Sequence, residues 1–458
     1  MRTRKNVQHP RNQGGNQRRR RRGGRGRGRP GGGPGPSQGS APIIDDNGIP
    51  FALISEKPEP PAPEPGTVFE APDDATLRHF GVLDLSRDGH GFLRSPDRAY
   101  EPSAEDPYVS VDLVRTYGLR DGDIIDGEVG EPRRRGQNPP LVSIRSICGM
   151  PPHEYYKTKK WDECTVIDPN RRLELTKNLD EITLRIIDLL APIGFGQRGL
   201  LVSPPRAGKT RILQQLARAV EINHPEAYLF VLLVDERPEE ATAMQRATEG
   251  EVVVSTNDST PENHTRITEM VLKKAKRLVE TGRDVVILMD SLTRLGRAWN
   301  LLARSGGRTL SGGMDSRSLE RPKAFFGAAR NLEEGGSLTI VATALIETNS
   351  KMDTVIFEEF KGTGNMELVL DRKLAEQRVW PAIDLSLSGT RKEEKLLPPN
   401  QLELIYRLRR VLQKVRPIDA ITMLVDRLEQ FPDNDKFLGS IDGDGKRPRG
   451  DGPFDHGV

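Results

Sequence analysis

The stretch GLLVSPPRAGKT, residues 199–210, decides the fold of this chain. An apolar run that leads into GKT and then into a helical pattern is typical of a phosphate-binding loop between a strand and a helix. Ser203 stands where the usual pattern opens with glycine, so a chance turn is the alternative interpretation. We expect Lys209 to reach the terminal phosphates of a nucleotide and the Thr210 hydroxyl to bind Mg²⁺. The nucleotide-binding residues predicted from this segment are Pro205, Arg206, Ala207, Gly208, Lys209, Thr210 and Arg211.

Two further apolar runs end in acids. Residues 228–236 (YLFVLLVDE) end in Glu236, and residues 285–290 (VVILMD) end in Asp290. Alternating strands and helices beyond residue 149 predict a parallel sheet covered on both faces, where ligands bind at the carboxyl ends of the strands. Asp290 is therefore predicted to support Mg²⁺ and Glu236 to polarise an attacking water. An isolated acid here would better fit a turn or a helix cap, but the upstream loop favours catalysis.

The composition excludes several classes of protein. A chain of 458 residues allows two or three domains, and its two cysteines provide neither a disulfide framework nor a metal quartet. No apolar run approaches the ~20 residues that a membrane span needs. We therefore expect a soluble, cytoplasmic protein without a membrane partner.

The positive charge is concentrated at the N-terminus. Residues 1–42 hold eleven Arg and one Lys but no acid, which leaves 57 basic and 66 acidic residues in the remainder, a net charge of −9. This Arg/Gly-rich arm predicts a disordered segment that binds nucleic acid, with a solvated low-complexity tail as the alternative. Residues 43–75 form a Pro-rich acidic linker.

Short apolar runs separated by turns in residues 76–150 predict a small five-stranded barrel of the OB or cold-shock type. In this type an exposed aromatic side chain stacks on a base and a nearby arginine contacts phosphate. Each candidate alone would fit the barrel core or its surface, but their clustering favours RNA binding. The candidates are His90, Phe92, Arg94 and Tyr108.

Residues 76 to about 428 resemble the transcription termination factor Rho family. The motifs that carry the resemblance, besides SPPRAGKT, are VLLVDERPEE at 231–240, LMDSLTRLGRA at 288–298, LSGGMDSRSL at 310–319, RPKAFFGAARN at 321–331, EEFKGTGNMEL at 358–368 and SGTRKEE at 388–394. The resemblance implies a connector at 151–184, a RecA-like P-loop ATPase domain at 185–432 and a disordered tail at 433–458.

The family resemblance also implies an activity. A member is a homohexameric, RNA-dependent ATPase and helicase that translocates 5′ to 3′ along single-stranded RNA and dissociates RNA polymerase, with polymerase and its elongation factors as partners. ATP and Mg²⁺ are the implied cofactors, and the resemblance implies that Trp380 lies against the adenine. The implied catalytic residues are Glu236, Arg237, Arg378 and Arg391. Arg391 is the arginine finger in this scheme, and an ion pair with Glu393 or Glu394 is its structural alternative.

The resemblance places two loops in the ring's central pore, at 304–313 and 347–352. The RNA-contacting residues there are Arg308, Ser311, Gly312 and Lys351. The chain departs from the family at the barrel, where His90 replaces an aromatic residue and residues 137–140 read QNPP instead of supplying another. Cytosine preference is therefore not implied.

Two other classes of function stay open from the sequence. A rotary-type or recombinase-type RecA-like ATPase shares the phosphate-binding loop and the trans arginine but does not account for the cold-shock-like domain. An RNA-packaging or condensate protein, in which the arm dominates and the ATPase is silent, would lose its RNA response when residues 1–42 are removed.

Overall fold

The computed structural model describes residues 77–132, 134, 136–303, 309–315 and 317–442. The arm at 1–42, the linker at 43–75 and the predicted RNA contact Arg308 lie outside the described residues. The described part of the chain contains no helix that is both long enough and apolar enough to span a membrane.

The first sheet is a small barrel, as predicted. Its strands, in the spatial order β3-β2-β1-β4-β5, are β1 (Leu77–Leu85), β2 (Gly91–Arg94), β3 (Tyr108–Val109), β4 (Ile124–Val129) and β5 (Leu141–Ile147). A parallel bridge between Tyr108 and Pro140 joins β3 to the chain before β5. Helix α1 (Val111–Tyr117) between β3 and β4 was not predicted. It begins where the Ser110 hydroxyl accepts from the Leu113 amide and ends at Gly118, whose φ is 58°.

The second sheet, here called the large sheet, has nine strands. Its main path is β16-β15-β7-β14-β10-β8-β9, and β13 and β6 extend it beside β14. Every pairing from β15 to β9 is parallel, whereas β16 is antiparallel. The strands are β6 (Val166–Ile167), β7 (Arg198–Ser203), β8 (Tyr228–Glu236), β9 (Glu251–Thr256), β10 (Asp284–Asp290), β13 (Arg330–Leu332), β14 (Ser337–Leu345), β15 (Met366–Val369) and β16 (Gly389–Thr390). The predicted α/β architecture is confirmed.

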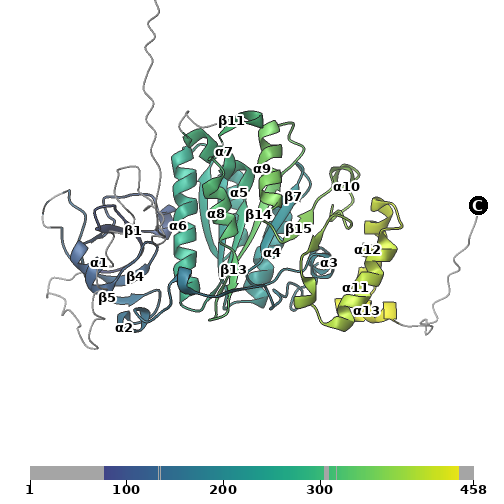
Figure 1. Cartoon of the computed structure of the whole chain (residues 1–458), viewed down its shortest axis with the longest axis horizontal. Coiled ribbons are helices and arrows are strands. Elements are labelled where there is room, and N and C mark those ends of the chain that lie inside the picture. Colours follow the sequence, from purple (N-terminus) through teal and green to yellow (C-terminus); the bar gives the residue numbers. More distant parts are fainter. Residues whose placement is uncertain (1–76, 133, 135, 304–308, 316, 443–458) are drawn as a thin grey trace, which may run out of the picture. The chain divides into compact units, whose positions relative to one another are not determined.

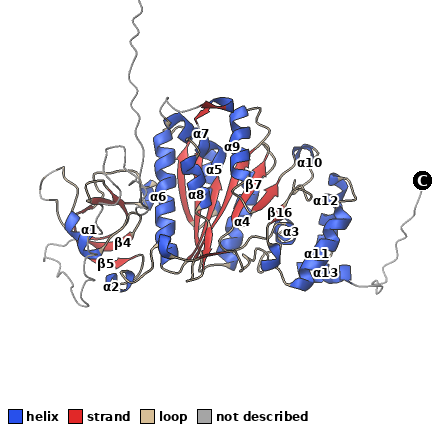
Figure 2. Ribbon diagram, in the orientation of Figure 1, coloured by secondary structure: helices blue, strands red, loops and turns tan. Residues whose placement is uncertain are grey.

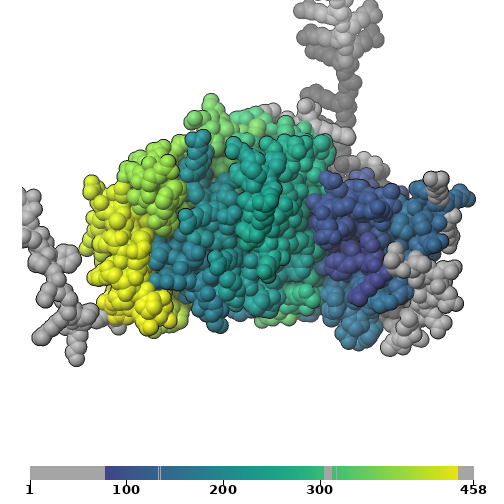
Figure 3. Space-filling view, turned by 180° about the vertical axis from the view of Figure 1, so that it is seen from behind, coloured from purple at the N-terminus to yellow at the C-terminus, as the bar shows by residue number. Residues whose placement is uncertain are grey.

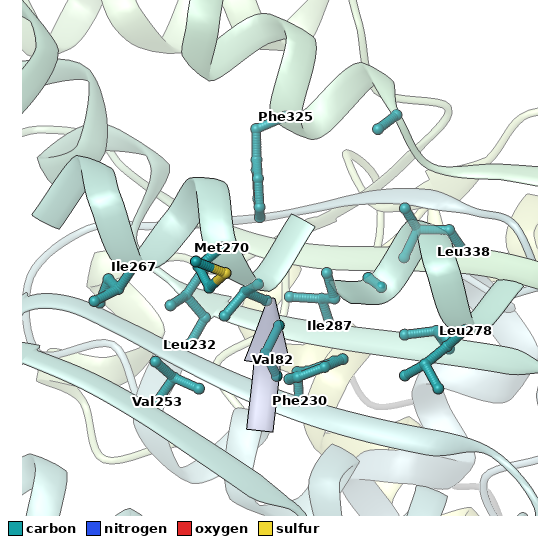
Figure 4. Close-up of a cluster of buried hydrophobic side chains, with 14 of the residues drawn as sticks. Val82, Phe230, Leu232, Val253, Ile267, Met270, Leu278, Ile287, Phe325 and Leu338 are labelled. Carbon is teal, nitrogen blue, oxygen red and sulfur yellow. The ribbon is translucent and has the colours of Figure 1, made fainter. Parts of the chain in front are cut away.

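Helices lie around the large sheet, as Figures 1 and 2 show. They are α3 (Ile182–Leu190), α4 (Lys209–Asn223), α5 (Pro238–Ala247), α6 (Pro261–Glu280), α7 (Leu292–Leu302), α8 (Glu320–Gly327), α9 (Lys351–Lys361), α10 (Arg372–Glu376), α11 (Pro399–Leu412) and α12 (Pro417–Glu429). The short helix α2 (Pro152–Tyr155) instead lies against β5 of the barrel (Figure 1). Between α7 and α8 lie β11 (Thr309–Leu310), the 3-10 turn η4 (Ser311–Gly313) and β12 (Met314–Asp315). The core under α6, drawn in Figure 4, includes Ile267, Met270 and Leu278 of that helix with Phe230, Leu232, Val253 and Ile287 of the sheet.

The C-terminal segment differs from the prediction. Residues 433–458 were expected to be disordered, but Asn434–Asp442 form helix α13, while residues 443–458 lie outside the described residues. Phe437 and Leu438 are 4% and 3% exposed in the core beside α11 and α12, and Figure 3 shows these helices in yellow. Arg185 of α3 fixes the preceding turn, because its guanidinium donates to the carbonyl oxygens of Leu428 and Phe431. The polar residues around Phe437 hid this short apolar pattern in the sequence.

Candidate functional site

The predicted phosphate-binding loop joins β7 to α4. Gly208 has a φ of 93° and precedes Lys209, the first residue of the helix. A Cβ atom at Gly208 would lie 3.0 Å from the Trp380 ring, so both the backbone and the ring require glycine here. Ser203, at the departure from the usual pattern, is buried at the end of β7, and its hydroxyl donates to the Pro204 carbonyl over 2.8 Å. The strand–loop–helix prediction is confirmed.

Lys209 lies between the two acids predicted at the strand ends. Its ammonium donates to Glu236 over 3.2 Å and to Asp290 at shorter range. Glu236 and Asp290 are 1% and 2% exposed, so two carboxylates share one cation in a buried place. Burial and the charge of Asp290 raise the pKa of Glu236 to about 7. A carboxyl group with this pKa can accept a proton near neutral pH.

Neighbouring side chains hold the two acids. The Thr343 hydroxyl donates to Asp290 over 2.6 Å, and the Arg294 guanidinium of α7 contacts Glu236 at 3.3 Å and the Asp235 backbone oxygen. The Thr210 hydroxyl donates to Glu240 over 3.3 Å, so in this structure it is directed to that carboxylate and not to Asp290. Glu240 and Arg294 were not predicted as site residues from the sequence. Glu240 lies within the VDERPEE motif, which was the available signal, whereas nothing local marks Arg294.

The oxygen atoms around Lys209 suit a magnesium ion. Mg²⁺ prefers hard oxygen ligands and is usually bound by one or two carboxylates together with substrate phosphates. The Thr210 hydroxyl and the Asp290 carboxylate supply such ligands. Among the described residues no group of three or more His, Cys, Asp or Glu could hold a metal without help. The donor set therefore fits a metal that arrives with a nucleotide.

A pocket of about 290 Å³ brings several predicted nucleotide-binding residues together. It is lined by Ala207, Gly208, Arg211 and Trp380, and also by Glu181, Thr183 and Gln215, which were not predicted. Pro205 and Arg206 are exposed at the loop. Arg237 is exposed at the start of α5, and Arg378 is exposed in the turn after α10 with a φ of 63°.

Arg391 lies away from this pocket in the same chain. It is exposed beside β16 and lines a separate pocket of about 400 Å³ with Arg409 and Glu393. Glu393 forms an ion pair with Arg409 at 3.1 Å. The alternative interpretation, an ion pair of Arg391 with Glu393 or Glu394, is not found among the described residues.

The rings of three predicted RNA-binding residues of the barrel lie close together. The ring centroids of His90, Phe92 and Tyr108 lie 5.6–5.8 Å apart, beside a cavity of about 850 Å³ that Phe92 and Tyr108 line. Arg94 differs from its predicted role, because Asp84 at 3.0 Å and Asp106 at 2.7 Å hold its guanidinium. The guanidinium instead lies over the Phe92 ring at 5.0 Å, so it fixes that ring.

Asn138 gives the QNPP segment a structural role in the barrel. Its amide donates to the backbone oxygens of Ser103 and Asp106 over 3.1 and 2.9 Å, which ties two loops together. The neighbouring Pro139 accepts the Tyr108 amide over 2.8 Å. This segment therefore closes the barrel beside the cavity.

The two loops predicted for the pore meet at Gly312. A Cβ atom there would lie 2.9 Å from the Met352 nitrogen and 3.0 Å from the Lys351 carbonyl carbon, so glycine permits the close approach. Lys351 is exposed at the start of α9. The backbone of Ser311 opens the η4 turn.

Comparisons with known proteins agree with this architecture. Residues 183–390 match the ATP synthase alpha/beta family, nucleotide-binding domain, and residues 79–153 match the Rho termination factor, RNA-binding domain. A solved ATPase from the type III secretion system of pathogenic bacteria has a TM-score of 0.52 at 19% identity, covering 69% of this chain and 93% of its own, which supports the fold alone. The fold and the site define a RecA-like P-loop ATPase with an N-terminal RNA-binding barrel.

Two relatives extend the comparison over most of the chain. Transcription termination factor Rho of Cereibacter sphaeroides is 52% identical over 366 residues, 79% of this chain and 86% of that protein. Its counterpart in Aquifex aeolicus is 51% identical over 362 residues, 78% and 83% of the two chains. The chain belongs to the transcription termination factor Rho family, and the resemblance seen in its motifs is confirmed.

Proposed function

We propose that this chain is an ATP-driven RNA translocase that terminates transcription. Six copies would form a ring, RNA would pass through the pore in the 5′ to 3′ direction, and the pull on the transcript would dissociate RNA polymerase. The observation that carries the proposal is the convergence of Lys209 on Glu236 and Asp290 in a chain that also has the family's RNA-binding domain.

The geometry suggests how the residues act. Lys209 would exchange its two carboxylates for the phosphates of ATP, which frees Glu236 to accept a proton from the attacking water. Mg²⁺, bound by Thr210 and Asp290, would supply positive charge to the phosphate oxygens. Trp380 would stack on the adenine. The side chains assigned to the subunit interface are Arg237, Arg378 and Arg391.

A chain of contacts supports coupling between the site and the pore. Arg294 of α7 contacts the strand end at Asp235, and Arg297, one turn later, forms an ion pair with Asp353 of α9 at 2.5 Å. Lys351 begins α9. A movement of α7 on hydrolysis would therefore reach the loop that is assigned to RNA.

The test is ATP hydrolysis by the purified chain with and without single-stranded RNA, alongside folded Glu236→Ala and Arg391→Ala variants. The proposal predicts that RNA raises the wild-type rate and that each substitution lowers kcat by about a hundredfold or more. No response to RNA at any salt concentration would reject the motor and favour RNA packaging. A response to DNA but not RNA would favour a recombinase-type ATPase.

A further inference from the structure

The backbone around Arg391 is held on two sides. Its amide donates to the Asn365 carbonyl over 2.9 Å, and the hydroxyl of Thr390 donates to the Pro192 carbonyl over 2.7 Å. The Arg391 side chain is exposed, and no hydrogen bond or ion pair of its guanidinium occurs within the described part of the chain. The backbone at Arg391 is therefore fixed, whereas its guanidinium has no partner in the described part of the chain.

Arg409 of α11 holds the turn at residues 388–395 through contacts of its guanidinium. Its guanidinium forms an ion pair with Glu393 at 3.1 Å and donates to the backbone oxygens of Leu190 at 2.5 Å and Ser388 at 3.3 Å. The side chains of Glu393 and Arg409 are only 11% and 19% exposed. One planar group therefore ties the residues on both sides of Arg391 to α3 and α11, which a lysine could not do at all three points.

Two further charges act on the same turn. Asp168 accepts from Lys392 at 2.9 Å and from Lys395 at 2.6 Å, which pins the far side of the turn. Arg198, fixed by the Thr363 carbonyl at 3.0 Å, lies near enough to Arg391 for the two positive charges to interact. This repulsion disfavours positions of the Arg391 guanidinium closer to Arg198.

We propose that Arg409 and Asp168 are positioning residues that hold the 388–395 turn so that Arg391 points toward ATP bound by a neighbouring subunit. The proposal rests on the proposed function, which makes Arg391 a finger in trans. Arg409 supplies most of the effect, because Asp168 and its lysines are partly exposed and exposed ion pairs contribute little.

The first experiment compares Arg409→Lys with Arg410→Lys in the full chain. Arg410 is a matched control, because it is the next residue of α11 and its guanidinium donates to the Tyr406 carbonyl of its own helix over 3.2 Å. We expect Arg409→Lys to lower the kcat of RNA-stimulated hydrolysis about tenfold, with the Kd for ATP changed less than about twofold. Arg410→Lys should match the wild type. An unchanged kcat for Arg409→Lys, or an equal loss in both variants, would overturn the proposal.

A mixing experiment separates positioning from general damage. Arg409→Lys subunits keep an intact nucleotide site, and Lys209→Ala subunits keep an intact finger. Mixed rings should therefore hydrolyse ATP faster than the sum of the separate variants, because some interfaces combine both intact halves. Absence of any gain would contradict positioning in trans.

Two further variants keep the test decisive. If Arg409→Lys does not fold, Asp168→Asn replaces it, with an expected loss of about threefold in kcat and the same gain on mixing. Arg391→Ala distinguishes the two levels of the proposal. If Arg391→Ala retains hydrolysis, the finger assignment itself fails. If Arg391→Ala abolishes hydrolysis while the Arg409 and Asp168 variants keep the wild-type kcat, only the positioning proposal fails.

Discussion

At the residue scale, Lys209 offsets the repulsion between two buried acids. Burial alone would lower the pKa of Lys209, but the charges of Asp290 and Glu236 raise it, so the ammonium stays charged. Removal of one partner from such a buried group leaves an uncompensated charge, which is costly. A bound nucleotide must therefore replace the contacts that Lys209 gives up.

Gly208→Ala tests the geometry of the phosphate-binding loop. The new methyl group would meet Trp380 at 3.0 Å at a φ of 93°, a backbone conformation that costs non-glycine residues about 1–2 kcal/mol. We expect a loss of this size in the free energy of unfolding and weaker ATP binding, measured by thermal unfolding and nucleotide titration. Gly439→Ala, with no atom within 4 Å of the new methyl group, is the control; it should keep the ATP affinity and gain up to about 1 kcal/mol of stability, because Gly439 lies inside helix α13. Equal stability and ATP affinity in both variants would contradict the account.

At the element scale, the coupling assigned to α7 and α9 depends on Asp353. This carboxylate is 1% exposed and accepts from Arg297 at 2.5 Å and from the Thr348 hydroxyl at 2.5 Å. Asp353→Asn removes the charge that holds Arg297. We expect RNA stimulation of hydrolysis to fall about fivefold or more while hydrolysis without RNA changes little, because the site itself is intact. Parallel losses in both rates would show that Asp353 stabilises the fold only.

Asp123, just before β4, makes the folding stability of the chain depend on pH. Its side chain is buried, accepts from the Tyr155 hydroxyl and from the Arg120 amide at 2.7 Å, and has its pKa raised by burial from 3.8 to about 6. Between these pH values the folded chain binds more protons than the unfolded chain, so this group's contribution to stability falls as pH rises, by at most about 3 kcal/mol.

Thermal unfolding of wild type and Asp123→Asn checks this sign. The difference between the two unfolding midpoints should decline from about pH 4 to about pH 6 and stay level above it, because Asn does not titrate. A flat difference, or one that grows with pH, would show that Asp123 is ionised throughout.

The strands, helices and loops of the site could be predicted from the sequence more fully than the contacts between distant side chains. The segments around Gly208, Glu236 and Asp290 were predictable because buried strands end in characteristic residues at the edge where ligands bind. The roles of Arg294 and Arg409 were not, because each joins elements far apart in the chain and no local pattern marks it. Arg94 was misjudged for the same reason, since Asp106 lies in a loop whose position only the fold defines.

At the scale of the whole molecule, we expect the motor to work without the Arg/Gly-rich arm. Deletion of residues 1–42 removes eleven Arg and one Lys. We expect RNA-stimulated hydrolysis to persist and the RNA affinity to depend less steeply on salt, measured by RNA binding from about 50 to about 200 mM salt. A variant with these arginines replaced by lysine keeps the charge and should keep the steep dependence. Loss of hydrolysis on deletion would favour the packaging alternative.

Movement along RNA is the central claim, and duplex displacement tests it most directly. The measurement follows release of a DNA strand paired to the 3′ part of an RNA whose 5′ part is single-stranded. The account predicts that the wild type releases the DNA strand only with ATP. The Glu236→Ala variant should bind the RNA but should not release the DNA strand. Hydrolysis stimulated by RNA without any strand release, or equal release without ATP, would contradict it.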